Sequence, residues 1–433
     1  MTMKSTAPHF TPGEWNACGA TQFYGKKKRS YIVEITLSEP IRGEFLQQAV
    51  DKALVRLPYY RSAFVRKKGL YYYADNDLPL LVAESEQPRV IGGKITNYHM
   101  VDVTYWKDKI SFAMFHGLCD GLGFNRFIEA VLYHYVCFKD GRVYNDEGIY
   151  TDKIPYDPAE TADIHSMRRK ADIKKVKAAM GTETRIRLPE LEGTEVEKMY
   201  SLPLRVKTGD FLGWCKANNA SPAAGAAAIM TQAIVREIGI REGVIMSVIP
   251  ISLRKALQAE KTFKNAYAAI FVPTTPEDAR RLSTGELAAR IRVAMKEKLT
   301  GEFPKLVSAG MNTIIHLGSR MPTYYLKNKV MAMSENNPQN TFFVDYVGGL
   351  RTNDYAGQIR HVRYLNAPPA NGATFLLMSE TAGYFHINFT QTIPSDRYYL
   401  AFGDILDELG IPYERLPFDS YLNPEVELPE EQK

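Results

Sequence analysis

The chain has 433 residues, a length that favours two domains or one large fold over a small module. Hydrophobic residues make up 45% and charged residues 24% of the sequence, which excludes collagen-like, low-complexity and wholly disordered chains. The net charge of +5 is too small for a chain of this length to indicate a nucleic-acid-binding protein.

The cysteines and the apolar runs indicate the compartment. Four scattered cysteines form no Cys-x-x-Cys pair, so neither a zinc site nor a disulfide framework is predicted. The first residues lack the apolar segment of a signal peptide, and the longest nearly apolar run, Ala223 to Val235, is far shorter than the roughly 20 residues that a membrane span needs. We therefore expect a cytoplasmic protein without a transmembrane segment.

The N-terminal part of the sequence predicts two strand–helix units. The β-prone run Tyr31 to Leu37 predicts a strand, and apolar residues at helical spacing predict a helix over Arg42 to Arg56. A second strand is predicted at Lys109 to Phe115. After a short turn, an apolar stripe from Phe124 to Tyr135 predicts the second helix.

The composition changes between Thr151 and Glu197. Prolines, a basic stretch from Arg168 to Lys177 and an acidic patch indicate a linker that carries a solvated helix. We therefore place an N-terminal domain at residues 1–175, a linker at 176–198 and a C-terminal domain at 199–433.

The predicted C-terminal domain has a similar order of elements. Its strands are predicted at Tyr200 to Val206, Val244 to Ile251 and Tyr384 to Thr390, and its helices at Gly209 to Asn218, Ala223 to Ile238 (capped by Ser221-Pro222) and Asp396 to Leu409. The last strand and helix repeat the order of the Lys109 to Tyr135 unit. The sequence thus predicts an α/β fold of two similar halves, of which only the first has a glycine-rich polar turn.

That turn, between Phe115 and Phe124, holds the densest group of reactive side chains. His116 can act as a general base because its ordinary pKa of about 6.5 lies near neutral pH. Asp120 can neutralise a cation, cap the following helix or fix the turn. Gly121 and Gly123 allow a close backbone approach or a positive φ. A packed histidine followed by an N-cap aspartate and turn glycines is the alternative interpretation.

Other catalytic motifs do not occur in the sequence. It has no complete dinucleotide loop, nucleophile elbow, phosphate-binding loop or His-Glu-x-x-His motif. Cys119 paired with His116 is an alternative nucleophile, although a thiol beside Leu118 more often packs in a core. Isolated histidines are expected to be packed or at the surface: His99, His134, His316, His361 and His386.

The segment His116-Gly-Leu-Cys-Asp120-Gly121 resembles the His-x-x-x-Asp-Gly signature of the coenzyme-A-dependent acyltransferase superfamily. This superfamily includes chloramphenicol acetyltransferase, alcohol acetyltransferases, plant BAHD acyltransferases and peptide-synthetase condensation domains. The chain length, the motif about a quarter of the way along, the two similar halves and the segment Leu54 to Arg61 extend the resemblance over nearly the whole chain.

The resemblance implies two chloramphenicol-acetyltransferase-like domains, each a mixed β-sheet flanked by helices, with a tunnel at their interface. It implies catalytic roles for His116, Asp120 and Gly121, with His116 as the base. The strand that ends at Arg254 is similar to the superfamily strand whose arginine pairs with the motif aspartate, so we expect a salt bridge between Arg254 and Asp120.

A further segment, Asp345-Tyr-Val-Gly348-Gly349, partly matches the Asp-Phe-Gly-Trp-Gly motif of BAHD enzymes but lacks its tryptophan. Asp345 and Gly348 are therefore candidate residues for shaping a loop. Condensation domains usually carry two adjacent histidines, whereas Phe115 precedes His116 here, as in stand-alone acyltransferases.

The resemblance therefore implies an enzyme that transfers an acyl group, expected to be acetyl, from acyl-CoA to an alcohol. It implies no bound cofactor, since acyl-CoA is a co-substrate, and a monomer. The alternatives are a condensation-type enzyme that takes its acyl group from a phosphopantetheinyl carrier protein and forms an ester or an amide, and a non-catalytic relative. Candidate cations for the phosphates of CoA lie in three basic runs: Lys26 to Arg29, Arg66 to Lys68, and Arg168 to Lys177.

Overall fold

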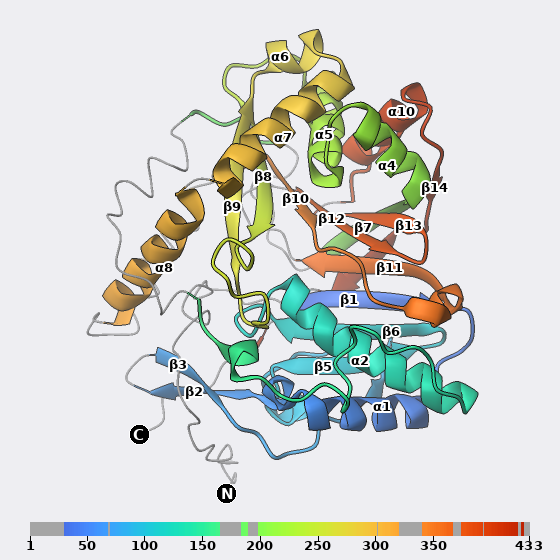
Figure 1. Ribbon diagram of the computed structural model, residues 1–433. Coiled ribbons are helices and arrows are strands. Elements are labelled where there is room, and N and C mark those ends of the chain that lie inside the picture. Colours follow the sequence, from blue (N-terminus) through green and yellow to red (C-terminus); the bar gives the residue numbers. More distant parts are fainter. Residues whose placement is uncertain are drawn as a thin grey trace, which may run out of the picture.

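The computed structural model describes residues 30–67, 70–164, 183–188, 198–300, 302–319, 340–366, 374–392, 394–422 and 426–427. The basic stretch Arg168 to Lys177 lies outside these residues, and of the predicted linker only 183–188 and 198 lie within them. Two β-sheets with helices packed against them form a mixed α/β structure (Figure 1). Among the described residues, no helix has the length and hydrophobicity needed to cross a membrane.

The first sheet has five strands in the order β11-β1-β6-β5-β4. Its strands are β1 (Ser30–Leu37), β4 (Ala83–Glu84), β5 (Val101–Trp106), β6 (Lys109–Phe115) and β11 (Ile359–Asn366). All neighbours are antiparallel except the parallel pair of β4 and β5, so the sheet is mixed. Helices α1 (Gly43–Arg56) and α2 (Gly121–Asp140) pack against each other and share the apolar core of this sheet (Figure 1).

One strand of this first sheet comes from the other end of the chain. β11 pairs with β1 in antiparallel register, with Tyr31 opposite Asn366 and Ile35 opposite Val362. Every residue of β1 is buried, so the strand needs a partner on both sides to satisfy its backbone N–H and C=O groups. A segment of the predicted C-terminal domain therefore completes the sheet of the N-terminal one.

The second sheet has eight strands. Their order is β14-β7-β13-β12-β10-β8-β9, and β15 also pairs with β7. β10 runs parallel to β12 and to β8, so this sheet is mixed as well. Its strands are β7 (Lys198–Lys207), β8 (Ile245–Ser252), β9 (Tyr267–Thr274), β10 (Phe342–Tyr346), β12 (Thr374–Thr381), β13 (Tyr384–Gln391), β14 (Tyr413–Arg415) and β15 (Asp419–Leu422).

Helices flank the second sheet, and α5 is the most deeply buried of them. It contacts α7, α10 and the strands β8 and β10. The helices of the second half are α4 (Thr208–Ala217), α5 (Pro222–Ile238), α6 (Pro276–Arg281), α7 (Thr284–Thr300), α8 (Phe303–Ser319) and α10 (Arg397–Glu408).

A separate hairpin, β2 (Ala63–Lys67) with β3 (Leu70–Ala74), lies beside the first sheet (Figure 1).

The strands and helices predicted in the described residues are confirmed. The cap of α5 is also confirmed, since the Ser221 hydroxyl accepts a hydrogen bond from the Ala224 N–H at 3.3 Å. α2 continues to Asp140, beyond its predicted apolar stripe, and stops at Gly141, whose φ of +63° is a left-handed conformation that glycine adopts easily. The domain boundaries and the interface tunnel stay predictions.

Candidate active site

The glycine-rich turn joins β6 to α2, and its three leading carbonyl groups are held by side chains from distant segments. Two of the donors are tyrosine hydroxyls, and the third is an asparagine amide that precedes β9. These bonds are Asn265 Nδ2 to His116 O (2.9 Å), Tyr73 Oη to Gly117 O (2.6 Å) and Tyr59 Oη to Leu118 O (2.6 Å). The backbone of the turn is therefore fixed independently of the His116 ring.

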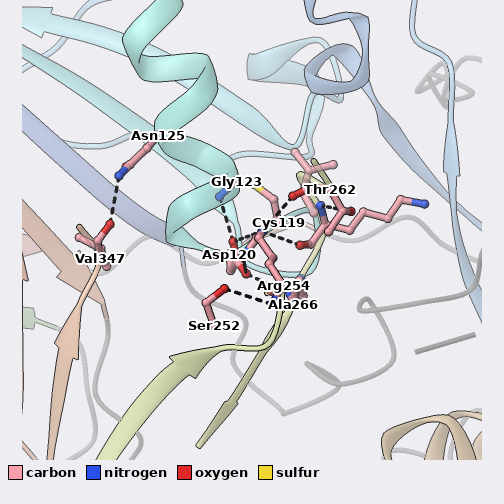
Figure 2. Close-up of polar contacts among 12 residues, drawn as sticks. Cys119, Asp120, Gly123, Asn125, Ser252, Arg254, Thr262, Ala266 and Val347 are labelled. Atoms are coloured by element: carbon pink, nitrogen blue, oxygen red, sulfur yellow. Dashed lines mark hydrogen bonds and ion pairs between the residues drawn. The ribbon is translucent and has the colours of Figure 1, made fainter. Parts of the chain in front are cut away.

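Asp120 ends the turn and caps α2 (Figure 2). Its Oδ1 accepts hydrogen bonds from the Gly123 N–H (2.9 Å) and from Arg254 Nη2 (2.8 Å). Its Oδ2 accepts from Arg254 Nη1 (2.8 Å) and from the Ala266 N–H (3.0 Å). The structure thus contains the expected Asp120–Arg254 salt bridge. Four donors on its two oxygens thus fix the position of the Asp120 carboxylate.

Arg254 connects the turn to the second half of the chain. Besides the two bonds to Asp120, its guanidinium donates to the carbonyl oxygens of Thr262 (2.9 Å) and Lys264 (3.0 Å). Both side chains of the ion pair are about nine-tenths buried. The segment that follows β8 is therefore tied directly to the start of α2 (Figure 2).

Gly121 and Gly123, in the first turn of α2, are explained by close approach and not by a positive φ. A Cβ at Gly123 would lie 1.9 Å from the carbonyl oxygen of Phe263. A Cβ at Gly121 would lie 3.0 Å from the hydroxyl oxygen of Tyr31 and 3.1 Å from Val347 Cγ1. Side chains at either position would push neighbouring segments away from the first turn of α2.

His116 is half-buried between two aromatic rings. The centroid of its ring lies 5.5 Å from that of Tyr31 and 5.8 Å from that of Tyr267. Burial lowers the pKa of His116 below its ordinary value, while its own backbone carbonyl, the Asp120 charge and Asn265 act in the opposite direction. Burial therefore favours the neutral imidazole, which is the form that can accept a proton.

Asp345 and Gly348 lie at the end of β10 and in the loop that follows. Gly348 has a φ of +78°, which only glycine adopts readily. This conformation supports the expected role of Gly348 in shaping the loop. The loop contacts α2, since Asn125 Nδ2 donates to the Val347 carbonyl at 3.3 Å (Figure 2). Burial is the main cause that raises the pKa values of Tyr31 and Tyr267, the two tyrosines beside His116, and the Asp345 charge acts in the same direction. Asp345 therefore contributes charge near the turn.

Burial and the Asp120 charge raise the pKa of Asp345 to about 7. Between about pH 4 and pH 7 this carboxyl group therefore holds more protons in the folded protein than in the unfolded chain, and its contribution to stability falls as the pH rises through that range. We expect Asp345→Asn to remove the contribution of this group, so that the unfolding temperature of the variant exceeds that of the wild type at pH 8 and approaches it at pH 5. Thermal unfolding of both proteins from pH 5 to pH 8 measures this, and parallel profiles would contradict it.

The alternative nucleophile is disfavoured. Cys119 is fully buried, and burial raises the pKa of its thiol well above the usual range, so no thiolate is available near neutral pH. Its Sγ lies 3.2 Å from Met114 Sδ, in the core of the first sheet. These observations favour a packing role.

The isolated histidines whose side chains the structure describes contact residues outside the turn. His99 contacts the carbonyl oxygens of Leu78 and Arg61, and His386 contacts that of Thr381. His134 is buried on α2, His361 contacts Thr36, and His316 lies on α8, where its side chain is outside the described residues. The basic runs Lys26 to Arg29 and Arg168 to Lys177 also lie outside the described residues.

Sequence reasoning missed two residues beside His116. Tyr31 was part of a predicted strand, but nothing in its spacing distinguished it among 26 tyrosines. Tyr267 begins β9, a strand that the sequence analysis did not predict. Only the folded arrangement of β1, β6 and β9 brings these two rings to the histidine.

No family model and no curated protein matches this sequence. Solved structures match over most of its length. Polyketide synthase associated protein 5 from Mycobacterium tuberculosis has a TM-score of 0.61 at 14% identity, covering 89% of this chain and 96% of that one. TRI3 trichothecene 15-O-acetyltransferase from Fusarium sporotrichioides has a TM-score of 0.60 at 10% identity, covering 93% of this chain and 99% of that one. The first condensation domain of the calcium-dependent antibiotic synthetase has a TM-score of 0.60 at 12% identity, covering 94% of this chain and 97% of that one.

A further match is F. sporotrichioides TRI101 complexed with coenzyme A and T-2, with a TM-score of 0.57 at 10% identity, covering 92% of this chain and 98% of that one. All four structures have the fold of the coenzyme-A-dependent acyltransferases and condensation domains. The chain therefore has the two-domain chloramphenicol-acetyltransferase-like fold, which confirms the fold class that the resemblance implied.

Proposed function

We propose that this protein transfers an acyl group from acyl-CoA to the hydroxyl group of an alcohol, with His116 as the general base. The observation that carries the proposal is a histidine that lies between two aromatic rings, on a turn whose backbone is fixed by three other side chains. The fold of a 15-O-acetyltransferase and of a protein that binds coenzyme A supports it.

The reaction needs one proton acceptor and no covalent enzyme intermediate. The unprotonated nitrogen of His116 removes the proton from the acceptor hydroxyl as its oxygen attacks the thioester carbon. The tetrahedral intermediate carries its negative charge on the former carbonyl oxygen, and the N–H of Gly121 at the start of α2 is a candidate donor to it. When the intermediate collapses, the C–S bond breaks and the thiolate of CoA takes the proton from the His116 imidazolium.

Two further residues act through the turn and not on the substrate. Arg254 holds Asp120, and Asp120 holds the first turn of α2, so the pair sets where His116 lies. Asp345 and Gly348 are proposed to shape the loop after β10, which packs against α2.

The pH dependence follows from the lowered pKa of His116. Because only the neutral imidazole accepts a proton, kcat/KM is expected to stay at its plateau through pH 7 and to fall only below about pH 6.5, the ordinary value for histidine. A profile of kcat/KM between pH 5 and pH 9 measures this. An acid limb centred above pH 7 would contradict a base with a lowered pKa.

A condensation-type reaction is the second candidate, because the chain matches a condensation domain as well as it matches the acetyltransferase. There the donor would be an acyl group on the phosphopantetheine of a carrier protein, and the product an ester or an amide. The single histidine, preceded by the buried Phe115, favours free acyl-CoA. The cytoplasmic location and the monomeric state stay predictions.

The test is the release of free thiol from acetyl-CoA and from longer acyl-CoAs, with and without a panel of alcohols and amines, together with the mass of the product. Alcohol-dependent release with one ester formed per thiol is the expected result. Release that depends on amines but not on alcohols would show that the enzyme forms an amide and not an ester. Transfer from an acylated carrier protein but from no free acyl-CoA would establish the condensation reaction. No product from either donor would favour a non-catalytic relative.

A further inference from the structure

The hydroxyl group of Tyr31 is buried in the protein without a hydrogen-bond partner among the described residues. The side chain is 1% exposed, and its strand is fixed on both sides, with Met114 of β6 and Asn366 of β11 as the paired residues. An unpartnered buried hydroxyl destabilises the folded state, because it loses its hydrogen bonds to water. Such a group indicates a cost without benefit, an ordered water molecule, or a partner that is absent from the free protein.

The surroundings of this hydroxyl favour a substrate as the absent partner. The Tyr31 ring contacts the His116 ring edge-on, with 5.5 Å between the centroids. The hydroxyl oxygen lies 3.0 Å from where a Cβ of Gly121 would stand, beside the first turn of α2. The first N–H groups of a helix have no intrahelical acceptor and attract negative charge. A hydroxyl, a helix N-terminus and a neutral base thus meet at one place.

We propose that the Tyr31 hydroxyl donates a hydrogen bond to the oxyanion of the tetrahedral intermediate, alongside the N–H of Gly121. This proposal rests on the proposed acyl transfer and names a second donor for that reaction. No bond to Tyr31 forms or breaks, and its proton stays on the phenol oxygen. Burial and the nearby Asp345 charge raise the pKa of Tyr31 well above its ordinary value, so the group remains a donor at any pH at which the enzyme works.

Tyr364 on β11 provides a matched control. Its ring lies 6.3 Å from that of Tyr31 and is equally buried, but its hydroxyl donates to Asn125 Oδ1 at 2.8 Å. Removing the hydroxyl of Tyr364 therefore breaks a hydrogen bond of the folded protein. Removing that of Tyr31 breaks none among the described residues.

The experiment compares Tyr31→Phe and Tyr364→Phe with the wild type in thermal unfolding and in acetyl transfer to the best alcohol of the panel. For Tyr31→Phe we expect kcat to fall about 10²–10³-fold, the loss typical of one oxyanion donor, with the KM for acetyl-CoA nearly unchanged and an unfolding temperature equal to or above that of the wild type. For Tyr364→Phe we expect a lower unfolding temperature and a kcat within a few-fold of the wild type.

Two results would overturn the proposal. One is a Tyr31→Phe variant whose kcat stays within a few-fold of the wild type. The other is a drop in its unfolding temperature as large as that of Tyr364→Phe, which would mean that the hydroxyl has a structural partner. If the wild type transfers no acyl group from any donor, the proposed function fails, and the unfolding comparison still decides whether the Tyr31 hydroxyl is unpartnered.

Discussion

Replacing His116 by glutamine is expected to slow acyl transfer by about 10²–10⁴-fold, the contribution that a positioned general base typically makes. Glutamine has a similar size, so it fits between the rings of Tyr31 and Tyr267, but its amide accepts no proton near neutral pH. The bond from Asn265 reaches the backbone carbonyl of residue 116 and survives the change. The rate of acceptor-dependent thiol release at saturating acceptor measures the loss.

His134→Gln is the matched control for that variant. His134 is buried and lies on α2, but its ring contacts Tyr133 and Phe138 and takes no part in the turn. We expect the control to keep its rate within a few-fold of the wild type, and His116→Gln to unfold near the wild-type temperature. A His116→Gln variant with full activity would show that the base lies elsewhere, even if acyl transfer itself were established.

Replacing Arg254 by methionine is expected to lower the free energy of unfolding by about 3–5 kcal/mol, because it leaves the buried carboxylate of Asp120 without its cation. The carbonyl groups of Thr262 and Lys264 lose their guanidinium donors as well. Acyl transfer should also slow, since the His116 turn is no longer tied to the segment after β8. Urea unfolding and the thiol-release rate of the same preparation measure both effects.

A second arginine separates the effect of burial from that of charge. Arg236 also makes a two-bond contact with a carboxylate, that of Glu408, at 2.6 and 2.5 Å, but its side chain is 42% exposed and that of Glu408 is 57% exposed. Water screens such a pair, so Arg236→Met is expected to cost about 1 kcal/mol or less. Adding Asp120→Asn to Arg254→Met should recover part of the lost stability. Equal losses at Arg254 and Arg236 would contradict a special role for the buried pair.

The sequence predicted those parts of the fold that are encoded locally. The apolar stripe of α2 and the Ser221-Pro222 start of α5 depend on side chains within a few residues of one another, so periodicity and capping preferences suffice to find them. The position of Asp120, one residue before the helix, is likewise a local signal for an N-cap, and the structure confirms that cap.

The rest of the site depends on contacts between distant segments. Tyr31 reaches His116 only because β1 pairs with β6, and the loop after β10 reaches Gly121 only because it packs on α2. No spacing within β1 or β10 carries this information. The Asp120–Arg254 pair was expected from the motif resemblance, whereas the four donors around Asp120 became visible only in three dimensions.

The strand β11 has a consequence for synthesis of the protein on the ribosome. While the chain is being made, β1 and β6 emerge early, but the partner for the outer edge of β1 is translated only hundreds of residues later. Until then a nascent chain would present an open, largely apolar sheet edge, which is a template for aggregation. A fragment that ends before Ile359 would keep that edge permanently, so the first half of this protein is a poor choice for separate expression.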